Sequence, residues 1–211
     1  MTPQKQYYET LAASIIKELE KRQMEGYYAA SKEEALQLIQ SYLTPEVSAA
    51  YGGSMTLEAL GFPKTLIDSG CTFYDRFADR SPAAQREIFG KIATADYYFM
   101  STNAITSDGI LVNIDGSGNR VASLIHGPQN VIVVAGMNKL APSLEAAIER
   151  ARNTAAVPNC IRLNKNTPCT KTGKCMNCQS PDCICNQIVI TRRSMIPNRI
   201  KVILVGESLG Y

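Results

Sequence analysis

The spacing of apolar residues changes several times along the chain and predicts an alternation of helices and strands. Between residues 8 and 19 the apolar side chains recur every three or four positions, as on one face of a helix: Tyr8, Leu11, Ala12, Ile15 and Leu19. Further helices are expected at residues 32–42, after the glycine turn at 52–53, from residue 82, and at 143–155. Short strands are expected at residues 27–30, 47–51, 71–74, 97–101 and 201–205.

The strands in the middle and at the end of the chain define the fold class. Residues 131–135 and 203–205 are continuous apolar runs, as in strands that helices cover on both faces. Residues 110–114 and 120–125 flank Asp-Gly-Ser-Gly and predict a β-hairpin. We therefore expect an α/β fold with a mainly parallel sheet covered by helices. It would form a single domain over residues 1–211, from which a cysteine-rich knuckle at residues 165–187 projects.

The composition excludes several classes of protein. Hydrophobic residues make up 45% of the chain and charged residues 19%, which is typical of a globular protein. No apolar run reaches the roughly 18 residues that a membrane-spanning helix needs. Acids and lysines are mixed through the first 22 residues, unlike a secretory signal peptide. We expect a soluble, cytoplasmic protein.

The formal net charge of +3 conceals a local asymmetry. Residues 1–150 carry more acidic than basic side chains, whereas residues 151–206 contain a single acid, Asp182, among many lysines and arginines. Of the 7 cysteines, all but Cys71 lie in the same basic stretch. Such a coincidence indicates a local functional device.

The cysteine spacing is typical of a metal site. Five cysteines follow the pattern C-x5-C-x2-C-x4-C-x-C between Cys169 and Cys185, and a C-x-x-C pair on a turn directs two sulfurs at one point. Four thiolates would hold either zinc or a [4Fe–4S] cluster, and the spacing does not choose between them. The surrounding basic residues favour deprotonated sulfur. The alternative is a set of free or disulfide-bonded cysteines, although a cytosolic chain argues against disulfides.

A glycine turn provides a candidate anion site. Gly52, Gly53 and Ser54 follow a predicted strand, and Thr56 opens the next helix. Backbone N–H groups that converge at a helix N-terminus bind phosphate and similar anions. A turn without a ligand is the alternative.

Small polar residues after the strand at 97–101 provide candidate catalytic groups. Asn103 and Asp108 would hold or deprotonate a small substrate, unless both are turn residues. Asp115 is expected at the tip of the hairpin. His126 is the only histidine, so a histidine pair for a metal is excluded, and its place before Gly-Pro is typical of a structural residue.

Several motifs together resemble the LUD domain family, which includes lactate utilization protein C. They are GGSMTLEALG, TNAITSDGILVNIDGSGNRVASLIHGP, VIVVAGMNK and PCTKTGKCMNC with the closing RIKVILVGESLGY, and the resemblance covers about residues 8–211. It implies a fold like that of ribose-5-phosphate isomerase, glucosamine-6-phosphate deaminase and the CoA transferases.

The resemblance also implies roles for individual residues. In enzymes of that fold a glycine-serine-threonine loop binds phosphate, which corresponds to Gly52, Gly53, Ser54 and Thr56. The stretch 108–113 is similar to a catalytic segment of the deaminase, but Ile110 replaces its histidine, which argues against deamination of a sugar phosphate. Cysteine-bearing relatives resemble this chain at four positions: Cys169, Cys175, Cys178 and Cys185. Those four would be the metal ligands, with Cys183 pointing away.

Three functions follow from these observations. The first is a LUD-domain protein of lactate utilization type, which binds a small anionic or phosphorylated ligand and a cysteine-held zinc ion or [4Fe–4S] cluster. The resemblance implies iron–sulfur proteins of lactate oxidation as its partners. The second is an isomerase- or CoA-transferase-like enzyme acting on a sugar phosphate or acyl-CoA. The third is a nucleic-acid binder with a basic zinc knuckle, against which the acidic remainder of the chain argues. Catalysis by the chain alone and assembly into a homo-oligomer stay open.

Overall fold

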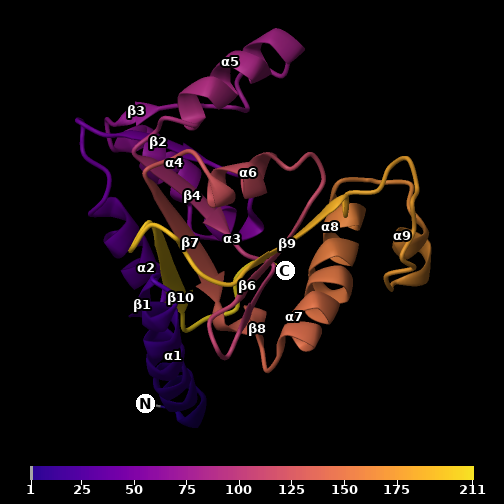
Figure 1. Cartoon of the computed structure of the whole chain (residues 1–211), viewed down its shortest axis with the longest axis horizontal. Coiled ribbons are helices and arrows are strands. Elements are labelled where there is room, and N and C mark those ends of the chain that lie inside the picture. The colour runs from indigo at the N-terminus through magenta and orange to yellow at the C-terminus, as the bar shows by residue number, and fades with distance from the viewer. Residues whose placement is uncertain (1) are drawn as a thin grey trace.

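The computed structural model describes residues 2–211 and has a six-stranded parallel sheet at its centre (Figure 1). In spatial order the strands are β1 (Glu25–Ala29), β10 (Ile200–Val205), β7 (Asn130–Gly136), β4 (Tyr97–Ser101), β2 (Ser48–Tyr51) and β3 (Thr72–Phe73). All five pairings between them are parallel. The predicted α/β fold with a mainly parallel sheet is confirmed.

Helices cover both faces of this sheet. They are α1 (Pro3–Lys21), α2 (Lys32–Gln40), α3 (Met55–Ala59), α4 (Phe62–Asp68), α5 (Pro82–Ile92) and α6 (Asn119–Ile125). Helices α1, α5 and α6 pack on one face, and α2, α3 and α4 pack on the other. None of the helices in residues 2–211 combines the length and the apolar character that a bilayer crossing requires.

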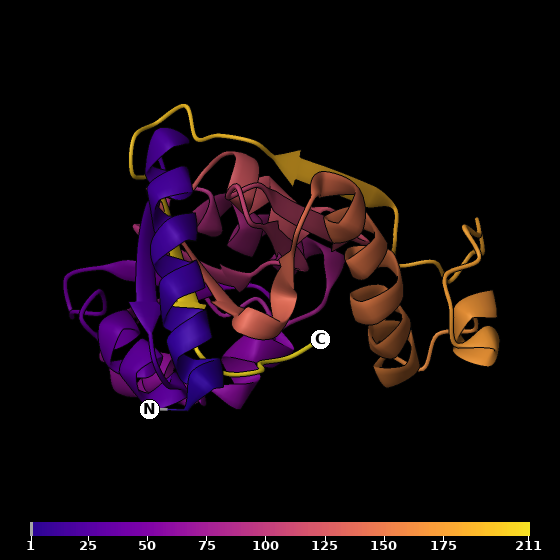
Figure 2. The same ribbon diagram turned by 90° about the horizontal axis from the view of Figure 1, so that it is seen from below.

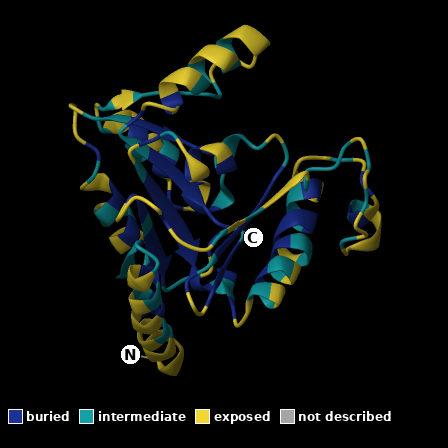
Figure 3. Cartoon of the chain, viewed as in Figure 1, coloured by how far each residue is buried: buried dark blue, intermediate teal, exposed yellow. Residues whose placement is uncertain are grey.

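Strand β7 shows why the central strands are apolar without interruption. Val131, Val133 and Ala135 face the α1 side, whereas Ile132 and Val134 face the α2 side, and all five are fully buried. Strand β10 alternates in the same way. The two predicted central strands therefore lie side by side in the middle of the sheet, as the dark blue strands of Figure 3 show.

A second, four-stranded sheet lies beside the first. Its order is β8 (Leu140–Ala141), β5 (Ala104–Thr106), β6 (Leu111–Asp115) and β9 (Gln187–Thr191). Helix α7 (Leu144–Arg150) packs on it, and a 3-10 helix, Met137–Lys139, connects β7 to β8. Beyond α7 follow α8 (Ala156–Arg162) and α9 (Pro168–Thr172), which stands at the edge of the molecule (Figure 2).

The predicted hairpin across Asp-Gly-Ser-Gly is wrong, because only its first half is a strand. Residues 119–125 form α6, and β6 pairs instead with β5 and β9. Gly118 has a left-handed φ of 84°, and its N–H donates to Asp115 Oδ1 at 2.9 Å, which turns the chain into a helix. Val121 and Leu124 are three residues apart and both enter the core. Asp115 is accordingly the buried last residue of a strand and not a hairpin tip.

The helix predicted at residues 143–155 continues to Arg162 through a π-helical turn, Ala151–Ala155. Pro158 explains the turn. A proline in a helix has no N–H to donate and its ring crowds the carbonyl four residues earlier, which here belongs to Thr154. The wider π turn accommodates this crowding, so the helix passes the proline without ending.

Candidate functional site

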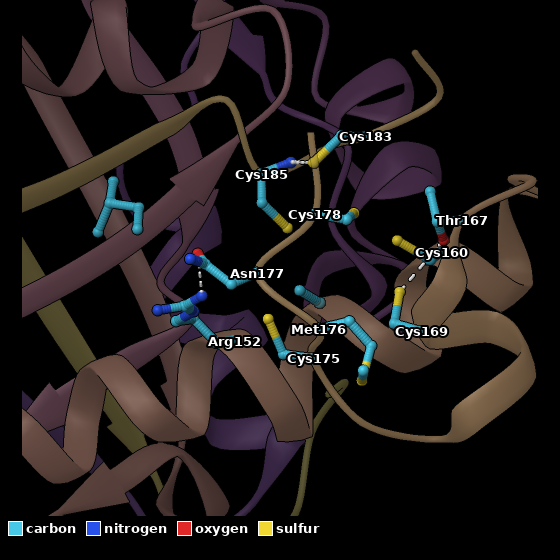
Figure 4. Close-up of a pocket in the computed structure, with 12 residues that line it drawn as sticks. Arg152, Cys160, Thr167, Cys169, Cys175, Met176, Asn177, Cys178, Cys183 and Cys185 are labelled. Carbon is cyan, nitrogen blue, oxygen red and sulfur yellow. Dashed lines mark hydrogen bonds between the residues drawn. The ribbon is translucent and has the colours of Figure 1, made fainter. Parts of the chain in front are cut away.

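A cavity of about 60 Å³ lies between α8, α9 and the loop that leads to β9 (Figure 4). Six of the cysteines line it: Cys160, Cys169, Cys175, Cys178, Cys183 and Cys185. The fold thus places the four predicted ligands around one space, together with Cys160 from α8. Cys183, which we expected to point away, lines the same space. Across residues 2–211 no three candidate ligand side chains are close enough together to hold an ion as they stand.

The cysteine loop is tied to the π turn by two hydrogen bonds. The Cys175 N–H donates to Asn153 Oδ1 at 2.7 Å, and Arg152 Nη2 donates to Asn177 Oδ1 at 2.5 Å. The π turn therefore presents Arg152 and Asn153 to the cysteines. A further hydrogen bond lies within the cysteine loop itself, where the N–H of Cys185 donates to Cys183 Sγ at 3.3 Å.

Burial favours the protonated form of two of these thiols. It raises the pKa of the Cys160 thiol to about 11 and that of Cys185 to about 12, and neighbouring cysteines add to both shifts. Arg152 lines the same cavity, and the neighbouring Cys175 raises the pKa of its guanidinium. Thiols in this state lose their protons when a metal ion binds.

The glycine loop follows β2 and leads into α3. Ser54 caps the helix, since its Oγ accepts the N–H of Leu57 at 3.3 Å. A Cβ on Gly52 would lie 2.7 Å from Tyr98 Oη and 3.1 Å from Arg120 Cγ, so this position requires glycine for packing. Gly53 is exposed, and its nearest neighbour would be Phe77 Cζ at 3.9 Å.

Thr56 is covered by the end of the chain. It is 1% exposed, and its Oγ1 donates to the carbonyl of Leu209 at 3.2 Å. Gly210 packs directly against Thr56. Of the four predicted loop residues, Gly53 and Ser54 therefore remain open to an anion.

A largely buried guanidinium, 12% exposed, lies directly beneath the glycine loop, and the sequence analysis missed it. Arg120, on α6, donates to the carbonyls of Ser101 and Ile114, each at 2.8 Å. It also donates to Asn113 Oδ1 at 2.5 Å, and its Nε lies 3.5 Å from Asp115 Oδ2. Arg120 thus joins β4 to β6, and its two terminal nitrogens together donate four hydrogen bonds, counting a further bond from Nη2 to the Asn103 side chain.

The two predicted catalytic residues are not brought together. Asn103 Oδ1 accepts the N–H of Ile114 at 2.8 Å and lies in the Arg120 network. Asp108 lies in the turn between β5 and β6, where its Oδ2 is 2.6 Å from Arg22 Nη2. His126 is exposed at the end of α6.

Lys139 is the second buried cation that the sequence analysis missed. Its side chain emerges after β7, is 4% exposed, and places Nζ 3.0 Å from Ser101 Oγ and 3.2 Å from the carbonyl of Thr102. Burial lowers its pKa to about 7, and the nearby Arg150 and Arg120 contribute to this shift. Its only sequence signal is its place directly after the buried run at residues 131–135.

Comparisons with known proteins agree with this fold. The sequence model of the LUD domain family matches residues 12–205. The crystal structure of a DUF162 family protein from Deinococcus radiodurans superposes with a TM-score of 0.53, at 11% sequence identity, over 94% of this chain and 98% of that chain. At that identity the likeness shows the fold alone. No curated protein matches the chain.

Proposed function

Because the chain belongs to the LUD domain family, we propose that it is a lactate-utilization-type protein with two functional sites. One is a metal centre held by cysteines, and the other binds a small anionic or phosphorylated ligand at the glycine loop. The observation that carries the first site is that six of the 7 cysteines line one cavity. Two of these cysteines come from helices α8 and α9 and four from the loop before β9, so the fold brings both helices to the cysteine loop.

Cys169, Cys175, Cys178 and Cys185 are the ligands of this proposal. Their thiolates are soft donors suited to zinc and to iron–sulfur clusters, and Arg152 offsets part of the negative charge that they would carry. A bound centre would fix the irregular loop at residues 173–186 and, if it is a cluster, would also supply one-electron chemistry. The loop is already anchored to the π turn by Arg152 and Asn153.

The volume of the cavity bears on which centre it holds. A space of about 60 Å³ accommodates several water-sized bodies, at roughly 10–15 Å³ for each. A zinc ion would require the four sulfurs to draw together, whereas a [4Fe–4S] core is itself larger than one water molecule. Zinc binding would therefore require a larger movement of the loop than cluster binding, and elemental analysis distinguishes the two centres.

The experiment is metal and sulfide analysis of anaerobically purified protein, with each cysteine replaced by serine in turn. Loss of any one of the four proposed ligands is expected to release most of the metal. Cys183→Ser and Cys71→Ser, the latter outside the cavity, are expected to keep it. Zinc without iron identifies a zinc site, and equal iron and sulfide in a brown protein identify a cluster. Protein that binds neither metal after reconstitution contradicts the proposal.

The anion site rests on the cations beneath the loop. Gly53 and Ser54 leave backbone N–H groups open to solvent, and the Arg120 side chain packs under Gly52. Lys139 Nζ reaches Ser101 Oγ, which is 3.2 Å from Thr56 Oγ1 in the first turn of α3. This excess of positive charge would attract a carboxylate or phosphate.

The family resemblance supports further parts of the proposal. We infer a fold of the ribose-5-phosphate isomerase, glucosamine-6-phosphate deaminase and CoA-transferase type, and a location in the cytoplasm with iron–sulfur proteins of lactate oxidation as partners. A single domain over residues 1–211 is supported by the main core, which contains Ile105 and Leu111 of the second sheet. The alternative, an enzyme acting on a sugar phosphate or acyl-CoA, is favoured by one observation, the buried Lys139.

A further inference from the structure

Lys139 is a buried amine without a carboxylate partner. No ion pair among the described residues includes it, and its Nζ contacts only the neutral oxygens of Ser101 and Thr102. A lysine buried for structural reasons is normally paired with an acid, because an unpaired ammonium group is costly to remove from water. A neutral amine avoids that cost, and it is also a nucleophile.

The charged groups around Lys139 are mostly positive, and only one carboxylate is present to balance them. Arg120 and Arg150 lie close enough to lower its pKa. Arg150 donates through Nε to the carbonyl of Asn138 at 3.0 Å and through Nη1 to that of Asn103, which leaves its Nη2 without a partner among the described residues. Asp115 is the one acid in the network and is paired with Arg120. The cluster therefore contains more cationic than anionic groups, which favours the binding of an anion.

A second polar group in the same cluster also has no partner. Asn113 is fully buried, and its Oδ1 accepts from Arg120, but no hydrogen-bond partner of its Nδ2 is found among residues 2–211. A buried amide N–H without an acceptor costs about 1–3 kcal/mol, so such groups mark positions that another molecule completes.

The cluster occupies the edge of the sheet at which α/β proteins bind their ligands. Ser101 is the last residue of β4, and Lys139 follows β7, its neighbour in the sheet. Both therefore lie at carboxyl ends of adjacent parallel strands. The Ser101 hydroxyl links Nζ to Thr56, and through it to the glycine loop.

We propose that Lys139 forms an imine with an aldehyde or ketone that carries an anionic group. The lone pair of neutral Nζ attacks the carbonyl carbon, and the carbonyl oxygen takes up a proton to give a carbinolamine. Loss of water from this adduct forms the C=N bond, and no oxidant or reductant is consumed. Ser101 is placed to relay the protons, while Arg150 and the loop at Gly53 would hold the anionic group. This step rests on the proposed anion site.

The protonation of Lys139 agrees with this role. With a pKa of about 7, roughly half of the amine is neutral at pH 7, whereas an ordinary exposed lysine is neutral in only about one molecule in 3,000. The difference is about a thousandfold in favour of Lys139. At neutral pH a carbonyl compound is therefore expected to react with Lys139 in preference to surface lysines.

In this proposal the entrance to the amine lies at the segment Leu209–Gly210, which covers Thr56 and is held by Asn138, the residue before Lys139. Asn138 holds this segment on both sides, because its Nδ2 donates to the carbonyl of Gly210 at 3.3 Å and its Oδ1 accepts the N–H of Leu209 at 3.1 Å. A substrate reaches Lys139 when these bonds open. Replacing Asn138 with alanine removes both bonds and leaves Lys139 in place.

The experiment is reductive trapping of the full-length protein at pH 7 with cyanoborohydride, followed by peptide mass spectrometry. The probes are pyruvate, ribose 5-phosphate and acetone, which has no anionic group. We expect an adduct on Lys139 with at least one anionic probe, at least tenfold above the exposed Lys64 and above acetone. Asn138→Ala is expected to label several-fold faster, and Lys139→Arg is expected to give no adduct at this position.

The outcomes separate this inference from the anion site. If inorganic phosphate stabilises the protein but no probe labels Lys139 in the wild type or in Asn138→Ala, the imine is wrong and the anion site stands. If acetone labels Lys139 as well as the anionic probes do, the amine is reactive and the anionic part is wrong. If labelling of Lys139 only equals that of Lys64, Lys139 is not a reactive amine.

Discussion

The pKa of Lys139 makes a prediction about stability that requires no substrate. Burial and the nearby arginines hold the pKa at about 7 in the folded protein, against an ordinary value of 10.5 once the chain unfolds. Between these two values the unfolded chain binds a proton that the folded protein has released. The free energy of unfolding therefore rises with pH in this window. Below pH 7 both states are protonated, and this dependence disappears.

The size of the effect follows from the same two values. A difference of one bound proton changes the free energy of unfolding by about 1.4 kcal/mol per pH unit. Half of the folded molecules are still protonated at pH 7, so the gain from pH 7 to pH 9 is about 2 kcal/mol. Lys139 is almost completely buried, so solvent screening reduces this figure little.

The assay is urea unfolding of the wild type and of Lys139→Met at pH 7, 8 and 9, with the same metal content in both. Every other titratable group is common to both proteins, so its contribution cancels in the difference. The wild type is expected to gain about 2 kcal/mol relative to the variant across these two pH units. A difference between the two proteins that stays constant from pH 7 to pH 9 would show that Lys139 is fully charged in the folded state.

Three other substitutions, one of them with a matched control, test the remaining structural arguments. Gly53→Val is expected to abolish the stabilisation by inorganic phosphate in a thermal unfolding assay and to leave the fold intact, and phosphate stabilisation that survives counts against the anion site. Gly136→Ala places a Cβ 2.5–2.7 Å from Asn138, Glu207 and Leu209 and is expected to cost about 1–3 kcal/mol in urea unfolding, whereas Gly90→Ala, which meets nothing, is expected to stabilise. Arg199→Met leaves three buried carbonyls without their donor and is expected to lower the free energy of unfolding by about 3 kcal/mol, and a loss below 1 kcal/mol would mean that water replaces the guanidinium.

The local pattern of apolar residues predicts the central sheet, because a strand that is buried on both faces consists of consecutive apolar residues. The predicted bounds of residues 97–101 coincide with β4, and the continuous apolar runs at 131–135 and 203–205 lie in β7 and β10. A strand covered on both faces has no polar side, so its sequence contains the evidence for its position.

The same pattern fails at α6 because the deciding contacts are distant. Asp-Gly-Ser-Gly suits a hairpin turn, but strand β9, more than 60 residues further along the chain, occupies the edge that the second half of the hairpin would need. Residues 119–125 instead form a helix that buries Val121 and Leu124 and positions Arg120. Arg120 and Lys139 could not be assigned to a site for the same reason. Their partners come from β4, from the loop that follows it and from β6, and a charged residue in an apolar context does not reveal which of these it will meet.

One helix connects the two candidate sites. Arg150, at the end of α7, donates to the carbonyls of Asn103 and Asn138 beside Lys139, and Arg152, two residues later, reaches Asn177 at the cysteine cavity. In a regular helix, residues two apart point in nearly opposite directions, about 200° around the axis. The π turn at Ala151–Ala155 begins between these two arginines and adds a residue to the circuit, so its position sets the angle between them. Since Pro158 gives rise to that turn, a residue in contact with neither site fixes how the cysteine cavity and the buried amine are oriented relative to each other.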